Sequence, residues 1–514
     1  MKTYKIGTRG SLLAVTQSTL IKNQLEKMAS DRFELVLIKT QGDEITTKPL
    51  WQLEGKDFFT KELDEALLKG EVDFVIHSYK DLGSERPEGI KLAAVTERRF
   101  AHDILLIPQK LIDQLPHWEG DFNVGTSSPR RIVNLSSELK NYIPYINQKN
   151  IAVKTQMLRG NVNTRIKKLK DGQYHAVTLA LAGLERLAQG EKSRAELAEL
   201  LDGLNYFILP QSVFPSAASQ GALGIEIKND RDDGGYLLSL LDQLNHQITI
   251  EEVSRERKAF KEYGGGCHLA VGIHVKKVAD TFLHVHAGEV DGKSIKLKKL
   301  EDQKQWPSIK GRKLFIGLPK TDREGLICDQ YVAKIPQTKN LNLSHQHVFV
   351  TSRYTLPTLK ASQASRPQGL WAAGVKTAEL LAQDGFWING SADSLGTADL
   401  KVFQQSNVLK MMHPQILDQW TVLSHQEATS DIGQVVGCYD RKNQDVSEDF
   451  VQKMKDVGAC FWTSIHQYHA YLEKFPFLKD ANHYCGLGKT WQEFKAAGLH
   501  IIPLANMQEF YELK

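Results

Sequence analysis

The chain has 514 residues, of which 41% are hydrophobic and 25% are charged, and its formal net charge at pH 7 is +4. This composition is ordinary for a globular protein of about three or more domains, and so small a charge excess does not by itself indicate nucleic-acid binding. The five cysteines are widely spaced without a CxxC pair, which argues against a disulfide framework or a structural zinc site. No apolar run is long enough for a membrane helix, and the first residues do not resemble a signal peptide. We therefore expect a cytoplasmic monomer that holds no metal and binds neither membrane nor nucleic acid.

Short apolar runs alternate with amphipathic helical stretches along the whole chain, a pattern typical of α/β organisation. In the N-terminal part, strands are expected at residues 4–7, 33–39, 73–78 and 175–180, and helices at 11–28 and around 183–187. A further helix is expected to start near Ile248, with Thr249 as its N-cap and Glu252 completing a capping box. Residues 301–311 are polar and indicate a linker. Beyond it a second α/β unit is indicated by expected strands at 313–317, 347–351, 434–439, 459–463 and 500–504.

The stretch YGGGCHLAVG places Cys267 directly after three consecutive glycines. Glycine allows the main chain to adopt positive φ angles or to approach a bulky group closely. Two interpretations follow from the residues alone: the cysteine lies in a tight buried turn, or it is presented to a partner.

Arginines recur where expected strands end and helices begin. Arg9 precedes a helix opened by Ser11, and a helix N-terminus beside a guanidinium group forms an anion site. In GTSSPRR, Ser128 suits an N-cap and Pro129 the first helical position, and two arginines in that first turn oppose the helix dipole unless an anion offsets them. Asn161 is a similar cap between two arginines. Singly, each arginine is more often a solvated surface charge, but together they favour one polyanionic ligand at the carboxyl ends of the strands. The later members of this set are Arg130, Arg131, Arg159, Arg165 and Arg186.

Lys80 and Asp81 follow the strand that ends in IHS. Taken alone, the dipeptide is explained equally well by a surface ion pair. Inside an arginine-lined cleft, however, a carboxylate is costly unless it serves a cationic species. Asp81 is therefore a candidate acid/base group or stabiliser of developing positive charge.

Seven motifs in order resemble the hydroxymethylbilane synthase family, also called porphobilinogen deaminase; they are GTRGSLLA, IHSYKDL, GTSSPRR, LRGNVNTRIKKL, LALAGLERL, SQGALGIE and GGGCHLAVG. The resemblance covers about residues 1–300. It implies two α/β domains like those of type II periplasmic binding proteins over residues 1–222, with the active-site cleft between them. A small α/β domain with the cysteine is implied over 223–300. The family is a transferase that polymerises four porphobilinogen molecules on a dipyrromethane primer, releases ammonia and yields a linear tetrapyrrole.

The resemblance also assigns roles to residues. It implies that the dipyrromethane cofactor is attached to Cys267 through a thioether, and that Asp81, with Lys80, assists the loss of ammonia and stabilises the positively charged pyrrole. Porphobilinogen carries carboxylates, which a guanidinium group holds better than a lysine does. The residues implied to bind cofactor and substrate are Arg9, Ser11, Lys80, Thr126, Ser127, Ser128, Arg130, Arg131, Arg159, Arg165 and Arg186.

Residues 312–514 contain motifs that resemble uroporphyrinogen-III synthase, among them HVFVTS, AGVKTA, CFWTS and GLGKT. That family has two α/β domains with a cleft between them and closes the linear tetrapyrrole into uroporphyrinogen III. The resemblance implies a bifunctional enzyme of porphyrin and heme biosynthesis, with a lyase as its second activity. The candidates for substrate contact are Thr377, Ser464 and Thr490, although hydroxyl residues at helix starts are more often simple N-caps.

Two alternatives stay open. In the first, the C-terminal module is inactive or regulatory. In the second, the whole chain is an anion-binding protein on a periplasmic-binding fold, although the GGGC element and the lack of a signal peptide count against this.

Overall fold

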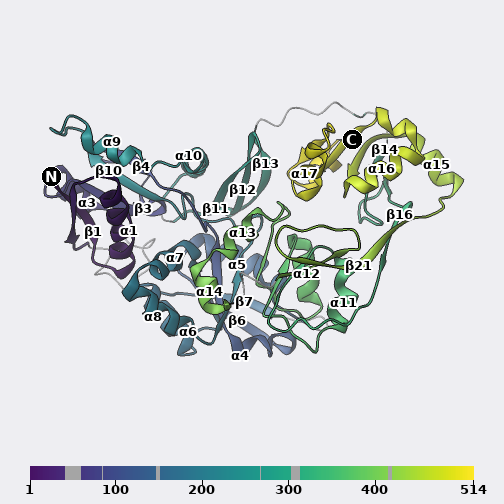
Figure 1. Cartoon of the computed structure of the whole chain (residues 1–514), viewed down its shortest axis with the longest axis horizontal. Helices are drawn as coiled ribbons and strands as arrows, with labels where there is room; N and C mark the ends of the chain where they lie inside the picture. Colours follow the sequence, from purple (N-terminus) through teal and green to yellow (C-terminus); the bar gives the residue numbers. More distant parts are fainter. Residues whose placement is uncertain are drawn as a thin grey trace.

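The computed structural model describes residues 1–40, 60–83, 85–145, 151–266, 268–301, 309, 313–414 and 420–513. These residues form five sheets with helices between the strands, which confirms the expected mixed α/β class (Figure 1). The first sheet lies at one end of the elongated molecule, and α15 (Glu448–Lys455) lies at the other (Figure 1). None of the described helices is long and apolar enough to cross a membrane.

The first domain is built on a sheet with strand order β2-β1-β3-β10-β4. Its elements are β1 (Thr3–Arg9), α1 (Leu12–Met28), β2 (Arg32–Ile38), α3 (Lys61–Leu68), β3 (Phe74–Ser78), β4 (Ile90–Val95), β10 (Leu223–Lys228) and α9 (Tyr236–Asp242). β10 runs antiparallel between β3 and β4, and leucines of α9 pack in the same core. The boundary expected at residue 223 is therefore wrong, because the chain returns here to complete the first sheet before it enters the small domain.

The second domain has the same kind of sheet, with order β7-β6-β8-β5-β9. Its elements are β5 (Asp103–Pro108), α4 (Gln109–Ile112), β6 (Gly120–Gly125), α5 (Pro129–Glu138), β7 (Ile151–Gln156), α6 (Val162–Lys170), β8 (Ala176–Ala180), α7 (Leu181–Gln189), α8 (Glu191–Leu201) and β9 (Leu204–Ile208). Two crossover segments, residues 96–102 and 209–222, connect it to the first domain. They lie against each other, since a Cβ added to Gly221 would be 3.0 Å from the carbonyl oxygen of Arg99.

The third domain packs one helix on a three-stranded antiparallel sheet. Its elements are α10 (Gln247–Glu262), β11 (Ala270–Val278), β12 (Thr281–Val290) and β13 (Lys293–Leu300). The N-cap of α10 is His246, whose ring accepts a hydrogen bond from the Thr249 N–H, so the capping box expected at Thr249 is wrong by one turn. The helix starts earlier because an imidazole nitrogen can accept this hydrogen bond in place of the more usual hydroxyl.

The C-terminal module, residues 312–514, contains two mainly parallel sheets. The first has order β16-β21-β20-β17-β18-β19 and comprises β16 (Val332–Pro336), β17 (His347–Val350), α11 (Leu356–Ala361), β18 (Gly369–Ala372), α12 (Val375–Gln383), β19 (Gly390–Ser391), α13 (Ala398–Gln404), α14 (Asn407–Met412), β20 (Trp420–His425) and β21 (Gln434–Asn443). The second has order β15-β14-β22-β23-β24 and comprises β14 (Lys313–Ile316), β15 (Leu326–Cys328), α15, β22 (Val457–Trp462), α16 (Ile465–Lys474), β23 (Asn482–Gly486), α17 (Lys489–Ala496), β24 (Ile502–Leu504) and α18 (Met507–Tyr511).

Candidate functional site

The strand ends of the first domain bring the expected site residues to one edge of its sheet. Arg9 is the last residue of β1, and Lys80 and Asp81 lie in a single 3-10 turn directly after β3. Because β1 and β3 are parallel neighbours, both groups lie at the carboxyl edge, where α/β folds bind ligands. Ser11 is the N-cap of α1 and accepts a hydrogen bond from the Ala14 N–H, so its hydroxyl has a local structural role as well.

Lys80 and Asp81 differ in their surroundings. The Asp81 side chain is exposed, whereas Lys80 is half-buried and donates to the Gln220 side chain at 3.1 Å. Burial lowers the pKa of Lys80 to about 8, and the neighbouring Asp81 carboxylate opposes this shift. The charge of Asp81 also acts on Arg165 and Arg186 of the second domain. The carboxylate expected to be catalytic therefore faces cations from both domains.

Arg130 and Arg131 are buried in the first turn of α5, and the anion that offsets them comes from the chain itself. Asp103, at the start of β5, accepts from Arg130 Nη1 at 2.7 Å and from Arg131 Nη2 at 2.7 Å and Nε at 3.0 Å. The two guanidinium groups hold the pKa of this buried carboxyl well below its usual range. Further donation goes to the backbone carbonyls of Pro215 and Thr178. The structure thus gives both arginines a built-in partner that the sequence pattern did not identify.

Gln220 links this buried cluster to Lys80. Its amide nitrogen donates to Asp103 at 2.8 Å, and its amide oxygen accepts from Lys80. The residue lies in the second crossover segment, inside the motif SQGALGIE, but neither its charge nor its spacing marks it as a site residue. Sequence reasoning missed this link between the buried cluster and Lys80.

Arg165 and Arg186 are half-buried cations, and the carboxylate whose charge acts on both is the exposed one of Asp81. Burial and the guanidinium groups of Arg131 and Arg159 lower the pKa of Arg165 to about 10, and burial lowers the pKa of Arg186 to about 10. A shift in this direction means that the protein alone disfavours the charged form. A bound polycarboxylate would offset that cost, so the donor set fits a pyrrole carrying acetate and propionate groups.

The hydroxyl residues after β6 have mixed roles. Thr126 is buried, and its hydroxyl accepts from the Ser128 N–H at 3.4 Å. Ser127 exchanges hydrogen bonds with the backbone of Leu158, which ties the loop after β7 to this strand end. Ser128 is the N-cap of α5, as expected, but its side chain makes no capping hydrogen bond. Asn161 caps α6, as expected, by accepting from the Thr164 N–H at 2.9 Å.

Cys267 lies outside the described residues, but the glycines before it do not. Gly264, Gly265 and Gly266 have φ angles of 100°, 60° and 92°. Three consecutive left-handed residues are strained for any side chain, which explains why the sequence has glycine at all three positions.

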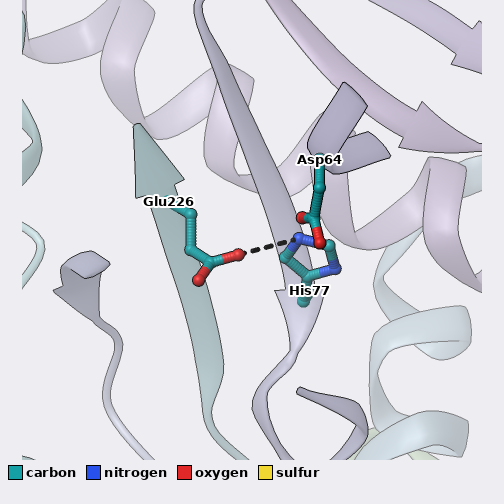
Figure 2. A group of neighbouring side chains, drawn as sticks. All are labelled: Asp64, His77 and Glu226. Carbon is teal, nitrogen blue, oxygen red and sulfur yellow. Dashed lines mark ion pairs between the residues drawn. The ribbon is translucent and has the colours of Figure 1, made fainter. Parts of the chain in front are cut away.

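A second buried polar cluster lies in the first domain, where Asp64, His77 and Glu226 converge from α3, β3 and β10 (Figure 2). Their ligand-type atoms lie within 4.8 Å of one another, as in some metal sites. Arg86, however, donates to both carboxylate oxygens of Glu226, at 2.7 and 2.8 Å, and to Asp64 Oδ1 at 2.5 Å, so the chain itself supplies a cation to these carboxylates. The cluster is an ion network that links α3, β10 and β3, the strand that precedes Asp81.

In the C-terminal module, the structure brings Thr377, Ser464 and Thr490 to one cavity of about 970 Å³. The cavity lies at the carboxyl ends of β17, β18 and β20 in one sheet and of β22 and β23 in the other. Two of the three hydroxyls also have structural partners. Ser464 accepts from the Gln467 N–H as the N-cap of α16, and Thr490 donates to the Thr463 carbonyl.

Cations line the same cavity. Lys334, Arg441 and Lys489 lie on its wall, and the acidic residues there include Glu427, which pairs with Arg441 at 3.4 Å. Burial and the nearby Arg441 and Lys489 lower the pKa of His425 to about 4, so its ring is neutral at pH 7. The cavity wall is therefore polar and carries cations that could hold the carboxylates of a ligand.

Comparison with known proteins shows which family the N-terminal part resembles. Residues 4–234 match the family described as "Porphobilinogen deaminase, dipyromethane cofactor binding domain". A porphobilinogen deaminase from Nostoc sp. is 36% identical over 280 residues, which cover 54% of this chain and 78% of that protein. One from Synechococcus elongatus is 34% identical over 318 residues, covering 61% of this chain and 90% of that protein.

Among solved structures, the uroporphyrinogen-III synthetase of Helicobacter pylori aligns over 37% of this chain and 92% of its own, with 12% identity and a TM-score of 0.26. A likeness this weak supports no statement about the C-terminal module. The sequence matches to the N-terminal part are much stronger, at 34–36% identity over most of each relative. They cover the residues that form the arginine-lined edge around Asp81. This chain belongs to the porphobilinogen deaminase family.

Proposed function

We propose that residues 1–300 act as a hydroxymethylbilane synthase, a transferase that joins porphobilinogen units into the linear tetrapyrrole and releases ammonia. The observation that supports this most directly is the excess of half-buried cations around the exposed carboxylate of Asp81. A simple anion receptor has no need of a carboxylate at the centre of its cationic cleft, because that group would repel the ligand.

Each residue then has a physical task. Arg159, Arg165 and Arg186 hold ring carboxylates of cofactor and substrate by charge-assisted hydrogen bonds. Asp81 stabilises the positive charge that develops on porphobilinogen as ammonia leaves, and Lys80, with its lowered pKa, assists proton transfer at the same place. When bound, the dipyrromethane supplies the pyrrole end from which the product grows. We assign Cys267 as its point of attachment, behind the three left-handed glycines.

The denatured intact mass of the protein tests this assignment. The unchanged chain is expected to be heavier than its sequence by a dipyrromethane, whereas a Cys267→Ser variant should have its sequence mass, because a serine hydroxyl does not form the thioether. Cys328 is a half-buried cysteine of the C-terminal module, and Cys328→Ser is the matched control that should keep the added mass. The absence of added mass on the unchanged chain, even after incubation with porphobilinogen, would refute the proposed function.

We also propose that the C-terminal module closes the linear tetrapyrrole into uroporphyrinogen III, which would make the chain bifunctional. Support comes from the cavity between its two sheets, which joins strand carboxyl ends, hydroxyls and cations in about 970 Å³. That volume is at the upper end of the range usual for small-molecule sites. The product of the first reaction is a flexible polycarboxylate, and the second site has the chemistry to hold one.

Replacing Arg441 by alanine is expected to shift the product from the type III ring toward the type I ring that forms by spontaneous closure. The reason is the loss of a cation from the cavity wall. Lys442→Ala is the matched control, since Lys442 is the next residue of β21, is exposed, and does not line the cavity. Separation of the two ring isomers after incubation with porphobilinogen gives the answer. Only type I product from the unchanged chain would refute the second activity and leave the first intact.

A further inference from the structure

The C-terminal module is packed tightly against the N-terminal part. Edge strands β9 and β19 meet, with the Ile208 N–H donating to the Asn389 carbonyl at 2.8 Å. The Asn389 amide nitrogen also donates to the Asn205 side chain at 2.7 Å. One hydrophobic cluster contains buried residues of both parts, including Tyr206 and Trp371, whose ring centroids lie 6.3 Å apart. An interface with a shared apolar core does not behave as a loose tether.

One turn of the module contacts the deaminase where it could affect catalysis. Residues 405–408, which join α13 to α14 and include the first two residues of α14, are here called the latch turn. Glu185 of α7 is 2% exposed and accepts hydrogen bonds from the backbone N–H groups of Asn407 and Val408, each at 3.1 Å, and from the Ser406 hydroxyl. A buried carboxylate of one part thus receives three donors from the other, and hydrogen bonds to a charged group are the strong ones.

The latch turn also contacts the first crossover segment. Arg99 donates to the side chain of Gln405, and the His102 ring lies edge-on to Phe403 of α13, just before the turn, with centroids 5.0 Å apart. In two-domain folds the crossover segments are where relative domain movement is absorbed. The module is therefore attached to the segment that sets how the first and second domains face each other.

The next residue of α7 points to the catalytic side. Arg186 follows Glu185, donates to the Gly221 carbonyl of the second crossover at 2.7 Å, and is acted on by the charge of Asp81. Glu185 and Arg186 are consecutive in a helix, so a displacement of one backbone position displaces the other. The latch turn, α7 and both crossovers thus form one connected set of contacts, and it includes Arg186, on which the charge of Asp81 acts.

We propose that the latch turn is a positioning element of the deaminase: by holding Glu185 and Arg99, the C-terminal module fixes α7 and the crossover segments and so places Arg186 beside Asp81. The deaminase surface around Glu185 and Arg99 thus has the chain's own C-terminal module as its partner. The module then influences tetrapyrrole formation independently of what it does to the product. This inference rests on the proposed hydroxymethylbilane synthase function.

The test uses Asn407→Pro in the full-length chain. Asn407 is the first residue of α14, where proline is well tolerated, and Ser406 before it has the extended backbone (φ −65°, ψ 124°) that proline requires. The substitution removes the N–H that donates to Glu185 and leaves the helix intact. Asn407→Ala, which keeps that N–H, is the matched control.

We expect Asn407→Pro to raise the KM for porphobilinogen about fivefold or more, the lower end of coupling between linked sites, with a smaller change in kcat. Asn407→Ala should keep the KM of the unchanged chain. Gln405→Ala removes the partner of Arg99 and should also raise the KM for porphobilinogen. If the proline variant does not fold, the KM of Gln405→Ala tests the inference in its place. Thermal unfolding and the denatured intact mass show that each variant is folded and loaded with dipyrromethane.

Equal KM and kcat in the folded, loaded proline and alanine variants would overturn the inference and make the interface purely structural. A KM that rises equally in both variants would also overturn it, because the effect would then not follow the N–H. An unchanged chain without the added mass of the dipyrromethane would refute the proposed function itself, and the inference with it.

Discussion

An Asp81→Ala variant is expected to lose catalysis almost completely while it keeps its fold. A positioned acid/base or charge-stabilising carboxylate typically contributes about 10²–10⁴ in rate, so tetrapyrrole formation should fall by that factor. Asp81 is exposed in the 3-10 turn after β3, so removing its side chain leaves no cavity in the core, and stability should change little. The initial rate of ammonia release from porphobilinogen measures the effect.

The control for this prediction is Glu88→Ala, which removes an exposed carboxylate of the same domain away from the strand end. The intact mass of the Asp81 variant must be compared with that of the unchanged chain, since assembly of the dipyrromethane uses the same chemistry. Protein that is loaded before the assay separates loss of turnover from loss of cofactor. A loaded Asp81→Ala variant with normal turnover would contradict the assigned role, whereas one that still binds porphobilinogen but releases no ammonia supports it.

Replacing Asp103 by alanine is expected to have the largest effect on stability. The change leaves Arg130 and Arg131 buried without their anion, and breaking such a buried pair on one side costs about 3–5 kcal/mol in the free energy of unfolding. It also removes one of the two acceptors of the Gln220 amide nitrogen, the other being the Ala101 carbonyl, and so loosens the partner of Lys80. Urea denaturation, monitored by circular dichroism, measures the decrease in the free energy of unfolding.

The same contact predicts a pH dependence. The pKa of Asp103 is lowered in the folded protein, so the stabilisation is complete above the pKa of an unfolded aspartate, about 3.9, and is lost as the pH falls below it. Asp103→Ala should flatten this acid limb of the stability profile. Asp113→Ala, which removes an exposed partner of Arg366, should cost no more than about 1 kcal/mol. A change of that small size for Asp103→Ala would show that the buried cluster does not stabilise the domain.

Local signals in the sequence were sufficient for most elements of the fold. Ser11, Ser128 and Asn161 were identified as caps because capping depends on residues within one turn, and all three precede helices. The boundary at residue 223 failed for the opposite reason. β10 belongs to the first sheet through pairing with β3, which is more than a hundred residues earlier, and no local pattern encodes that partner.

In the candidate site, too, residues marked by local sequence signals could be predicted, whereas residues defined by distant contacts could not. The arginines after strand ends could be found because strand, cap and cation are neighbours in the sequence. Asp103 could not, since it lies 27 residues before Arg130 and follows no motif. Gln220 and Glu185 are likewise defined by contacts with distant segments. The sequence therefore did not reveal mainly which polar groups bind one another in the folded chain.

The return of β10 to the first sheet has a consequence for the order in which the chain folds. β4 is an edge strand whose only neighbour in the described sheet is β10, and β10 is synthesised after the whole second domain. On the ribosome the second domain can therefore acquire its complete sheet while β3 and β4 still wait for the strand between them. Until β10 emerges, the nascent first domain exposes unpaired strand edges, which is when chaperone binding should matter most.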